Sequence, residues 1–438
     1  MYLKRRIDDN LLTWKNAQGR KPVLLRGARQ VGKSSTVREF GKSFDSFVEV
    51  NFEHRDFLFA KSVFEKHSSP RVICDELSAI LGVKITEGKT LLFLDEIQSC
   101  IPAISALRYF YEEMPDLHVI AAGSLLEFAL QQIPSFGVGR IRSLFMYPLS
   151  FDEFLRAMKF DVLADKVRKA TPDTGFSDEL HKKCMEQFNR FLLIGGMPEV
   201  VAAYAGGGSL LDCQQILDDL TNTFYDDFAK YREKVAVSRL RDVFGAVIYQ
   251  TGGKFVLSDV QGLNHLQIKD CLGLLEMAGL IYPVTHTSAN GLPLSAESNP
   301  KYRKYMLFDT GIYQRFLKLD IARILAFDRI EQVNKGALAE LFVALELKKA
   351  ATSNAPVELH YWRREKDGSS AEVDFVIQRN KDIVPIEVKS GTKGSMQSMF
   401  LFLKEKNRNY GIRTSLENFG KYNDVWVYPL YAIANSFC

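Results

Sequence analysis

The sequence contains few cysteines, and their spacing excludes two classes of stabilised domain. Only 6 of the 438 residues are cysteine, and no two of them lie within three residues of each other. A zinc site usually needs closely spaced pairs, and a disulfide framework needs a denser set. We therefore expect hydrophobic cores rather than cross-links, and a reducing cytoplasm as the compartment.

Long apolar runs are also missing. No stretch of about eighteen apolar residues occurs, and the basic N-terminus MYLKRRIDDN continues into charges rather than into an apolar segment. The sequence predicts no signal peptide, no membrane span and no membrane partner. With 46% hydrophobic and 25% charged residues, the composition is that of ordinary globular proteins. The length allows roughly two to four domains.

A strong excess of one charge is absent too, because the formal net charge is only +4. The charge is unevenly distributed, however, since residues 301–438 hold 22 Lys and Arg against 16 Asp and Glu. This predicts the C-terminal third as the place where a polyanion such as DNA or RNA binds, with an ordinary soluble surface as the alternative.

One short segment has the pattern of a phosphate-binding loop. The stretch GARQVGKSS fits GxxxxGK[ST] and lies between the strand-like run KPVLLR and the helix-like run STVREFGKSF. Glycines at positive φ let successive backbone N–H groups converge on phosphate oxygens at a helix N-terminus. Lys33 is predicted to reach the β and γ phosphates of ATP, and Ser34 to coordinate Mg²⁺. The predicted nucleotide-binding residues are Gly27, Ala28, Arg29, Gln30, Val31, Gly32, Lys33, Ser34 and Ser35.

A second apolar run, TLLFLDEIQ, ends in two carboxylates about 60 residues after this loop. Parallel strands present their carboxyl ends at the edge where ligands of open α/β sheets bind. Asp95 is predicted to hold Mg²⁺ through water, and Glu96 to orient and polarise the attacking water.

Two later segments supply further candidates. The strand-like run HVIAAGSLL ends near Ser124, which is predicted either to sense the γ-phosphate or to cap the next helix. The segment GVGRIRSL supplies Arg140 and Arg142. Either arginine is a candidate for stabilising transition-state charge, in cis or from the neighbouring subunit of a homo-oligomer, with a solvated surface arginine as the alternative.

Two strand-like segments near the C-terminus carry an acidic cluster. The apolar residues of AEVDFVIQ and DIVPIEVKSG alternate, so a hairpin across the intervening NKD would bring Asp374, Glu387 and Lys389 together. Two facing carboxylates need a cation between them, and Mg²⁺ or Mn²⁺ suits hard oxygen ligands. A neighbouring lysine can then activate water. The alternative is a sheet whose polar face is merely solvated.

A buried acidic residue precedes these strands. Glu340 lies among apolar neighbours in the helix-like run GALAELFVALELKK, where a carboxylate is costly without a partner.

The middle of the chain has helical spacing. From SFDEFLRAMKF to about residue 235 it predicts a helical lid over the nucleotide. Residues 238–286 predict three short helices, the second capped by Ser258 and Gln261, followed by the strand LIYPV. Such an order is typical of a winged helix, for which DNA recognition is one role and packing or oligomerisation the other.

The order GARQVGKSS, LLFLDEIQ, VIAAGSLL, GR, YPLSFDEF and FLLIGGMPEVV resembles the prokaryotic AAA+ superfamily of P-loop ATPases that carry a C-terminal domain related to PD-(D/E)XK nucleases. The resemblance implies metal binding by Glu340, Asp374 and Glu387, with Lys389 as a catalytic residue. This family usually has asparagine at the sensor position, where this chain has Ser124.

The predicted architecture is α/β, with four parts. They are an AAA+ P-loop ATPase core at 1–155, a helical lid at 156–235, a winged-helix connector at 236–300 and a nuclease-like domain at 301–438.

The predicted function is ATP hydrolysis by a nucleic-acid-directed machine in which the nucleotide state positions or licenses the C-terminal site. The alternative is a nucleotide-gated scaffold or signalling ATPase whose C-terminal fold is catalytically inactive and binds a partner. A small-molecule kinase is a third possibility, disfavoured by the long multi-domain C-terminal region.

Overall fold

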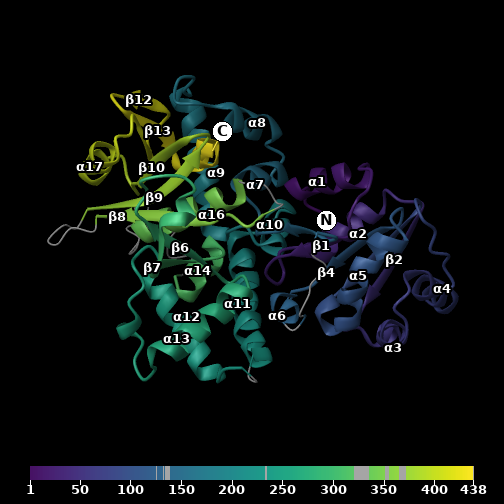
Figure 1. Cartoon of the computed structure of the whole chain (residues 1–438). Helices are drawn as coiled ribbons and strands as arrows, with labels where there is room; N and C mark the ends of the chain where they lie inside the picture. The colour runs from purple at the N-terminus through teal and green to yellow at the C-terminus, as the bar shows by residue number, and fades with distance from the viewer. Residues whose placement is uncertain are drawn as a thin grey trace. The chain divides into compact units, whose positions relative to one another are not determined.

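The chain folds into two compact units. The first is essentially Met1–Tyr147, and the second contains Pro148–Glu276 and most of the chain from Leu280 onward. Each unit is built on a β-sheet of its own (Figure 1). The computed structural model describes residues 1–124, 126–131, 133, 139–231, 234–319, 335–350, 355–364 and 371–437.

The first unit is a parallel five-stranded sheet in the order β2-β3-β4-β1-β5. Its strands are β1 (Val23–Arg26), β2 (Ser46–Asn51), β3 (Thr90–Asp95), β4 (His118–Ala122) and β5 (Arg142–Phe145). Its helices are α1 (Arg6–Lys15), α2 (Lys33–Gly41), α3 (Leu58–Lys66), α4 (Pro70–Leu81), α5 (Ile101–Glu113) and α6 (Leu126–Leu130), with the 3₁₀ turns η1 (Arg55–Phe57) and η2 (Ile97–Ser99). The three strands expected from KPVLLR, TLLFLDEIQ and HVIAAGSLL are confirmed.

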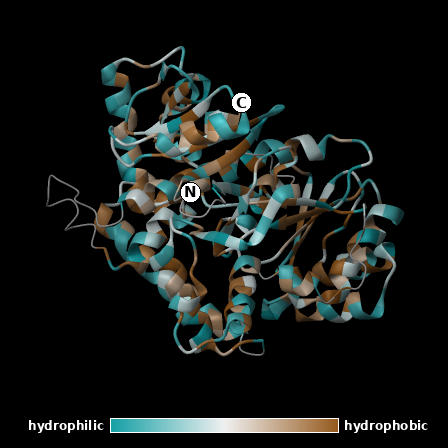
Figure 2. Ribbon diagram, turned by 60° about the vertical axis from the view of Figure 1, so that its left-hand side comes forward, coloured by the Kyte–Doolittle hydropathy of each residue, from teal (hydrophilic) through white to brown (hydrophobic). Residues whose placement is uncertain are grey.

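The central strands β1, β3 and β4 are largely apolar and buried, as expected where helices cover both faces of a sheet. All six residues of β3 are buried. Leu92 and Leu94 join the core cluster formed with α3, α4 and α5, whereas Phe93 stacks on Phe47 at 6.3 Å between ring centroids. Figure 2 shows brown, hydrophobic stretches within the strands and a mixture of teal and brown along the outer helices.

One buried histidine makes this unit sensitive to acid. His118 is 4% exposed, and its ring meets the edges of Trp14 and Phe44. Burial lowers the pKa of His118 from 6.5 to about 4. Between pH 6.5 and pH 4 this histidine therefore binds a proton in the unfolded chain but stays neutral in the folded chain. This histidine's contribution to stability is fully present above about pH 6.5 and is lost as the pH falls towards 4.

We expect the His118→Phe variant to lose less thermal stability than the wild type between pH 6.5 and pH 4. Phenylalanine keeps an aromatic ring but cannot be protonated. The measurement is the unfolding midpoint by circular dichroism across this range. His54→Phe is the control, because the His54 side chain is 55% exposed. Equal slopes for His118→Phe and the wild type would contradict the expectation.

The second unit is built on a mixed eight-stranded sheet in the order β12-β13-β11-β10-β9-β8-β6-β7. Its strands are β6 (Ile281–Thr287), β7 (Ser298–Leu307), β8 (Leu359–Arg363), β9 (Glu372–Arg379), β10 (Asp382–Val388), β11 (Gly411–Ser415), β12 (Gly420–Tyr422) and β13 (Val425–Pro429).

Its helices lie before the first strand of this sheet or between its later strands. They are α7 (Phe151–Ala157), α8 (Asp161–Lys169), α9 (Asp178–Ile194), α10 (Pro198–Ala205), α11 (Leu210–Asp227), α12 (Val237–Gln250), α13 (His265–Met277), α14 (Thr310–Phe316), α16 (Lys335–Ala350) and α17 (Gln397–Lys406), with the 3₁₀ turns η3 (Phe228–Tyr231), η4 (Leu257–Asp259), η5 (Leu294–Glu297) and η6 (Leu430–Phe437). The helical character expected after residue 150 is confirmed as far as Tyr231, whereas the role of this stretch as a lid over the nucleotide stays a prediction.

The predicted C-terminal hairpin is also confirmed. Strands β9 and β10 pair antiparallel, with Arg379 opposite Asp382 and Phe375 opposite Ile386. Met399 and Phe402 of α17 pack with Val373 of β9 in one core cluster. Helix α16 also contacts β8 and β10.

The connector differs from the prediction in its second helix. Residues 257–259 form only a 3₁₀ turn, and the capping box expected at Ser258 and Gln261 is wrong. The box lies at Asn264 and Gln267 instead, where each backbone N–H donates to the other side chain at 3.1 and 2.9 Å. Strands β6 and β7, which follow α13, belong to the large sheet. The winged-helix interpretation stays a prediction.

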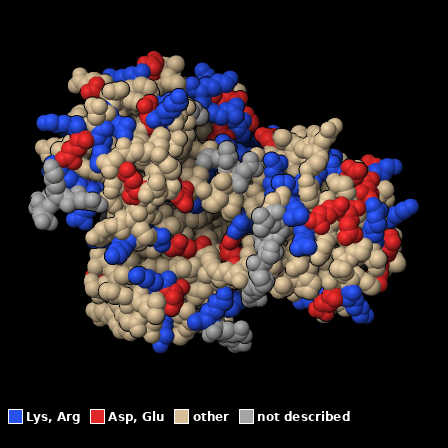
Figure 3. All heavy atoms as spheres, in the orientation of Figure 1, with Lys and Arg blue, Asp and Glu red and all other residues tan. Residues whose placement is uncertain are grey.

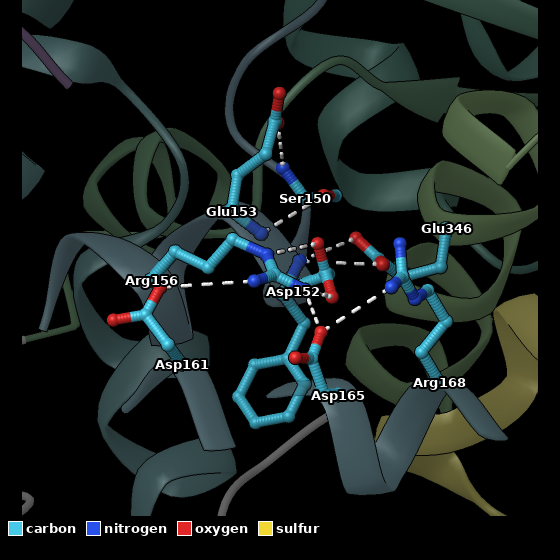
Figure 4. Close-up of polar contacts among 9 residues, drawn as sticks. Ser150, Asp152, Glu153, Arg156, Asp161, Asp165, Arg168 and Glu346 are labelled. Atoms are coloured by element: carbon cyan, nitrogen blue, oxygen red, sulfur yellow. Dashed lines mark hydrogen bonds and ion pairs between the residues drawn. The ribbon is translucent and has the colours of Figure 1, made fainter. Parts of the chain in front are cut away.

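The motif PLSFDEF lies where three helices of the second unit contact one another. Ser150 caps α7 in a capping box with Glu153. The next backbone N–H, that of Phe151, donates to both carboxylate oxygens of Glu346 in α16 at 3.3 Å. Nearby, Arg156 bridges Asp152 of its own helix and Asp165 of α8 (Figure 4). The motif therefore acts as a structural joint between α7, α8 and α16.

In the Gly195-Gly196-Met197-Pro198 turn, close backbone packing requires a glycine at position 196. The Gly196 N–H donates to the buried Asp309 carboxylate at 2.7 Å, and the Gly196 carbonyl accepts from the Leu149 N–H at 2.7 Å. A Cβ atom on Gly196 would lie 2.3 Å from the Leu149 carbonyl oxygen. Only glycine fits here, because the obstructing atoms belong to the backbone and cannot rotate away.

We expect Gly196→Ala to destabilise the second unit by about 3 kcal/mol or more, because the chain must move apart at this joint. The measurement is chemical unfolding followed by circular dichroism. Gly206→Ala is a milder control, since a Cβ atom there would lie 3.2 Å from the nearest atom. Equal stability of the two variants would contradict the packing argument.

Three predictions from composition can be compared with the fold. In the part of the chain that the structure describes, no helix is long and apolar enough to span a membrane. Cys74, Cys100, Cys184, Cys213 and Cys271 are buried and free. On the face shown in Figure 3, Lys and Arg are interspersed with Asp and Glu. That face gives no separate support to a polyanion site.

Candidate functional site

The loop between β1 and α2 has the backbone of a phosphate cradle. Gly27 has φ of 147° and Gly32, which caps α2, has φ of 96°. A Cβ atom on Gly27 would lie 2.1 Å from the Met146 carbonyl oxygen. Both predicted glycines therefore have conformations or neighbours that exclude a side chain. The loop ends at the N-terminus of α2, where the helix dipole favours an anion.

Lys33 points into this loop from the first turn of α2. Its ammonium donates to the carbonyls of Gly27 at 2.9 Å and Ala28 at 2.7 Å. Burial lowers the pKa of Lys33 to about 8, against the opposing influence of Glu96 and Asp95. A buried cation whose hydrogen-bond acceptors are neutral carbonyls can exchange them for phosphate oxygens with a gain in charge pairing. The residues thus fit a polyphosphate.

The other loop residues differ in exposure. Ala28 and Val31 are buried, Arg29 and Ser34 are half-buried, and Gln30 and Ser35 are exposed. The two apolar side chains anchor the loop to the unit, which leaves its backbone to face a ligand.

Asp95 and Ser34 form a pair of hard oxygen donors beside the loop. The Ser34 hydroxyl donates to Asp95 Oδ1 at 3.1 Å, and the Asn51 amide donates to Asp95 Oδ2 at 3.3 Å. Burial raises the pKa of Asp95 to about 6. A hydroxyl and a carboxylate in contact at the end of a buried strand fit Mg²⁺, which prefers oxygen ligands. Asn51 at the end of β2 was not predicted, because its pairing depends on the register of β2 with β3.

Glu96 follows directly in a left-handed backbone conformation, with φ of 49°. The Gln98 amide donates to Glu96 Oε2 at 2.7 Å, and the Ser124 hydroxyl lies 3.4 Å from the same oxygen. Ser124, two residues after the end of β4, is thus brought to the predicted catalytic carboxylate. Gln98 was missed, although its position two residues after Glu96 in DEIQ was a usable signal. A non-glycine residue at positive φ is uncommon and often marks a functional position.

A second missed residue supports the loop from the N-terminus. Arg5 is 5% exposed and donates to the Val31 carbonyl at 3.0 Å and the Tyr147 carbonyl at 2.7 Å. The sequence had indicated only a basic terminus, whereas this guanidinium ties the phosphate loop to the end of the unit.

Arg140 and Arg142 lie away from this loop within the same chain. Arg142 starts β5 opposite Val23, the first residue of β1, whereas the loop follows the last residue of β1. Arg140 pairs with Glu112 at the end of α5. The parallel register therefore argues against catalysis in cis by either arginine, and a role across a subunit interface stays a prediction.

The C-terminal cluster forms on the hairpin as expected. The Val388 N–H donates to Asp374 Oδ2 at 2.8 Å, and the Lys389 ammonium donates to Glu387 Oε1 at 2.7 Å. Burial, with the nearby Asp374 carboxylate, raises the pKa of Glu387 to about 7. Asp374, Glu387 and Lys389 therefore converge.

An unpredicted lysine lies inside this cluster. Lys304 of β7 is 1% exposed along its side chain, and its ammonium lies 2.8 Å from Glu340 and 2.7 Å from Glu372. Burial alone would lower the pKa of Lys304, but the carboxylates of Glu340, Asp374 and Glu372 outweigh it and raise the pKa above the ordinary value. The sequence signal was a lysine directly before the apolar end of YRKYML.

The metal ligands predicted for the C-terminal cluster, Glu340, Asp374 and Glu387, are not grouped as a coordination site in the described part of the chain. Within the described ranges, no three His, Cys, Asp or Glu side chains are placed to hold a metal ion. Glu340 is instead paired with Lys304. The donor set around Glu340, Asp374 and Glu387 thus does not fit a metal as it stands, and the roles assigned to these residues and to Lys389 stay predictions.

Comparisons with known proteins cover most of the chain. Residues 19–155 match the family model of an AAA domain, which supports an ATPase of the AAA type. Residues 185–322 match a domain of unknown function, DUF8612, and residues 335–433 match another, DUF4143. A search of curated proteins gave no match.

Among the solved structures with partial similarity, three serve as examples. A Walker-type ATPase of Pyrococcus abyssi shares 16% identity at a TM-score of 0.46, covering 72% of this chain and 96% of its own. The ORC1 protein of Aeropyrum pernix in complex with DNA shares 14% at 0.28, covering 73% and 92%. A signal transduction ATPase with numerous domains and a tetratricopeptide repeat sensor, from Pyrococcus horikoshii, shares 13% at 0.26, covering 81% and 46%. Similarities this low support no conclusion on activity or partners.

Proposed function

We propose that this chain binds ATP with Mg²⁺ at the loop Gly27–Ser35 and hydrolyses it. The observation that carries the proposal is the buried Lys33 ammonium, held by loop carbonyls beside the Ser34–Asp95 pair. The AAA-domain match over residues 19–155 supports the same activity.

Each residue has a distinct part in this reaction. The loop N–H groups and Lys33 would bind the phosphates and orient the terminal one, while Ser34 and Asp95 would hold Mg²⁺. When bound, Mg²⁺ neutralises charge that develops on the phosphate oxygens. Glu96 would orient the attacking water, and Ser124 and Gln98 would set the position of its carboxylate.

The first test is phosphate release from ATP by the full chain. Turnover is expected with Mg²⁺, with loss on chelation by EDTA and recovery when Mg²⁺ is restored. Turnover that persists in EDTA would contradict the assigned metal role, and no turnover under any condition would contradict hydrolysis.

For the C-terminal region we propose a nucleotide-gated scaffold or signalling role in which the fold binds a partner without catalysis. The buried ion pairs of Lys304 with Glu340 and Glu372 favour this version. The rival, cleavage of DNA or RNA by a nuclease-like domain, is favoured by the convergence of Asp374, Glu387 and Lys389. The proposed compartment is a reducing cytoplasm, which the five free buried cysteines support.

A cleavage assay separates the two versions. Single- and double-stranded DNA and RNA are incubated with Mg²⁺ or Mn²⁺, with and without ATP, and the wild type is compared with Asp374→Ala. We expect no metal-dependent cutting that is lost in the variant. Cutting that Asp374→Ala abolishes would establish the nuclease instead. Stimulation of ATP turnover by nucleic acid would separately identify a nucleic-acid partner.

A further inference from the structure

We infer that Lys304 is the resident cation of the C-terminal acidic cluster and takes the place that a divalent metal ion would occupy there. The native cluster would then bind no metal. This inference is independent of ATP hydrolysis at the phosphate loop, and it supplies a physical reason for a non-catalytic C-terminal fold.

The position of the ammonium carries the inference. Lys304 comes from β7, Glu340 from α16 and Glu372 from β9, so the lysine joins a helix to two strands of the same sheet (Figure 1). Its distances of 2.8 and 2.7 Å to the two carboxylates are those of short charge-assisted hydrogen bonds. These contacts occupy oxygens that a metal ion would need.

The carboxylates of Asp374 and Glu387 adjoin the group formed by Lys304, Glu340 and Glu372. Asp374 lies two residues after Glu372, so both side chains project from the same face of β9. Glu387 lies beside Asp374 on the neighbouring strand, as the pairing of Ile386 with Phe375 requires. A divalent cation between Asp374, Glu387 and Glu340 would therefore lie close to the Lys304 ammonium and be repelled by it.

Several contacts hold the Lys304 side chain within the cluster. The backbone of Lys304 is paired with Val284 on one side and forms a bridge with Lys254 on the other. Its ammonium lies 5.1 Å from the centroid of the buried Tyr361 ring, an additional favourable contact for a cation. Moving the side chain to solvent would break these contacts and leave buried carboxylates without their partner.

The inference predicts a specific gain of function. Lys304→Met keeps an unbranched side chain of similar length but removes its ammonium group. The carboxylates should therefore accept Mn²⁺ in place of the ammonium. Mn²⁺ is titrated into nucleotide-free full-length protein, and free Mn²⁺ is measured by electron paramagnetic resonance. The comparison includes the wild type, Lys304→Met, each of these combined with Asp374→Ala, and Lys301→Met, which changes an exposed lysine of the same strand.

We expect the wild type and its Asp374→Ala variant to bind equal amounts of Mn²⁺. We expect Lys304→Met to bind Mn²⁺ at least about tenfold more tightly, a gain that Asp374→Ala removes and Lys301→Met does not reproduce. Mn²⁺ binding by the wild type that depends on Asp374 would overturn the inference. So would a folded Lys304→Met that gains no Mn²⁺ site.

Two further measurements keep the test decisive if Lys304→Met does not fold. The double variant Lys304→Met with Glu340→Gln removes one charge of each sign, and its fold is checked by near-ultraviolet circular dichroism. The comparison of the wild type with Asp374→Ala needs no change at Lys304, so its result supports or overturns the inference by itself.

Discussion

The Glu96→Gln variant is expected to hydrolyse ATP at least about 100-fold more slowly than the wild type while still binding it. Glutamine has the same shape as glutamate but cannot accept a proton or polarise water as a carboxylate does. Binding should persist because the phosphate loop and Lys33 are unchanged. The left-handed backbone at Glu96 and its contacts with Gln98 and Ser124 place the carboxylate for this role.

Two measurements separate turnover from binding. Phosphate release gives kcat, and the quenching of a fluorescent ATP analogue gives Kd. Glu39→Gln is the matched control, because Glu39 forms an ion pair with the exposed Lys42 at the surface of α2. Unchanged turnover in Glu96→Gln would show that another group activates the water. Loss of both binding and turnover would show that Glu96 holds the loop rather than the water.

The Lys33→Ala variant is expected to bind ATP about 100-fold more weakly, because the phosphates lose a buried, desolvated cation. The ammonium donates to the Gly27 and Ala28 carbonyls, which places it inside the loop. Burial lowers the pKa of Lys33 to about 8. Because the buried ammonium is poorly hydrated, its ion pairing with phosphate should be strong.

Titration calorimetry with a slowly hydrolysed ATP analogue and Mg²⁺ gives the change in Kd. Lys42→Ala is the control, since Lys42 follows the same helix but its side chain is 73% exposed. The unfolding midpoint of each variant confirms that the loop is still folded. An affinity for ATP in Lys33→Ala that equals the affinity of Lys42→Ala would remove the phosphate role from Lys33.

The parts of the candidate site whose local geometry could be predicted depend on residues close together in the sequence. The loop glycines, Lys33 and Ser34 lie within one turn and the start of one helix, where backbone conformation follows from residue type. The pairing of β9 with β10 is similarly local, because a short turn separates the strands. Asp374, Glu387 and Lys389 could therefore be brought together from alternation alone.

The parts that were missed depend on the pairing of distant segments. Arg142 was a candidate for acting on its own nucleotide until the register with Val23 placed it at the opposite end of the sheet. Asn51 reaches Asp95 only because β2 lies beside β3. No periodicity within one segment carries such information.

The amino-acid sequence by itself determined the phosphate loop, the strand that ends in Asp95 and Glu96, and the acidic hairpin, because each is specified by short-range conformational preference. Only the tertiary structure decided what surrounds them. It places Gln98 and Ser124 on Glu96, ties Arg5 to the loop, and inserts Lys304 between Glu340 and Glu372. The buried charge of Lys304 is stabilised by carboxylates from a helix and a strand that are distant from it in the chain, and such an arrangement is made by packing rather than by local sequence.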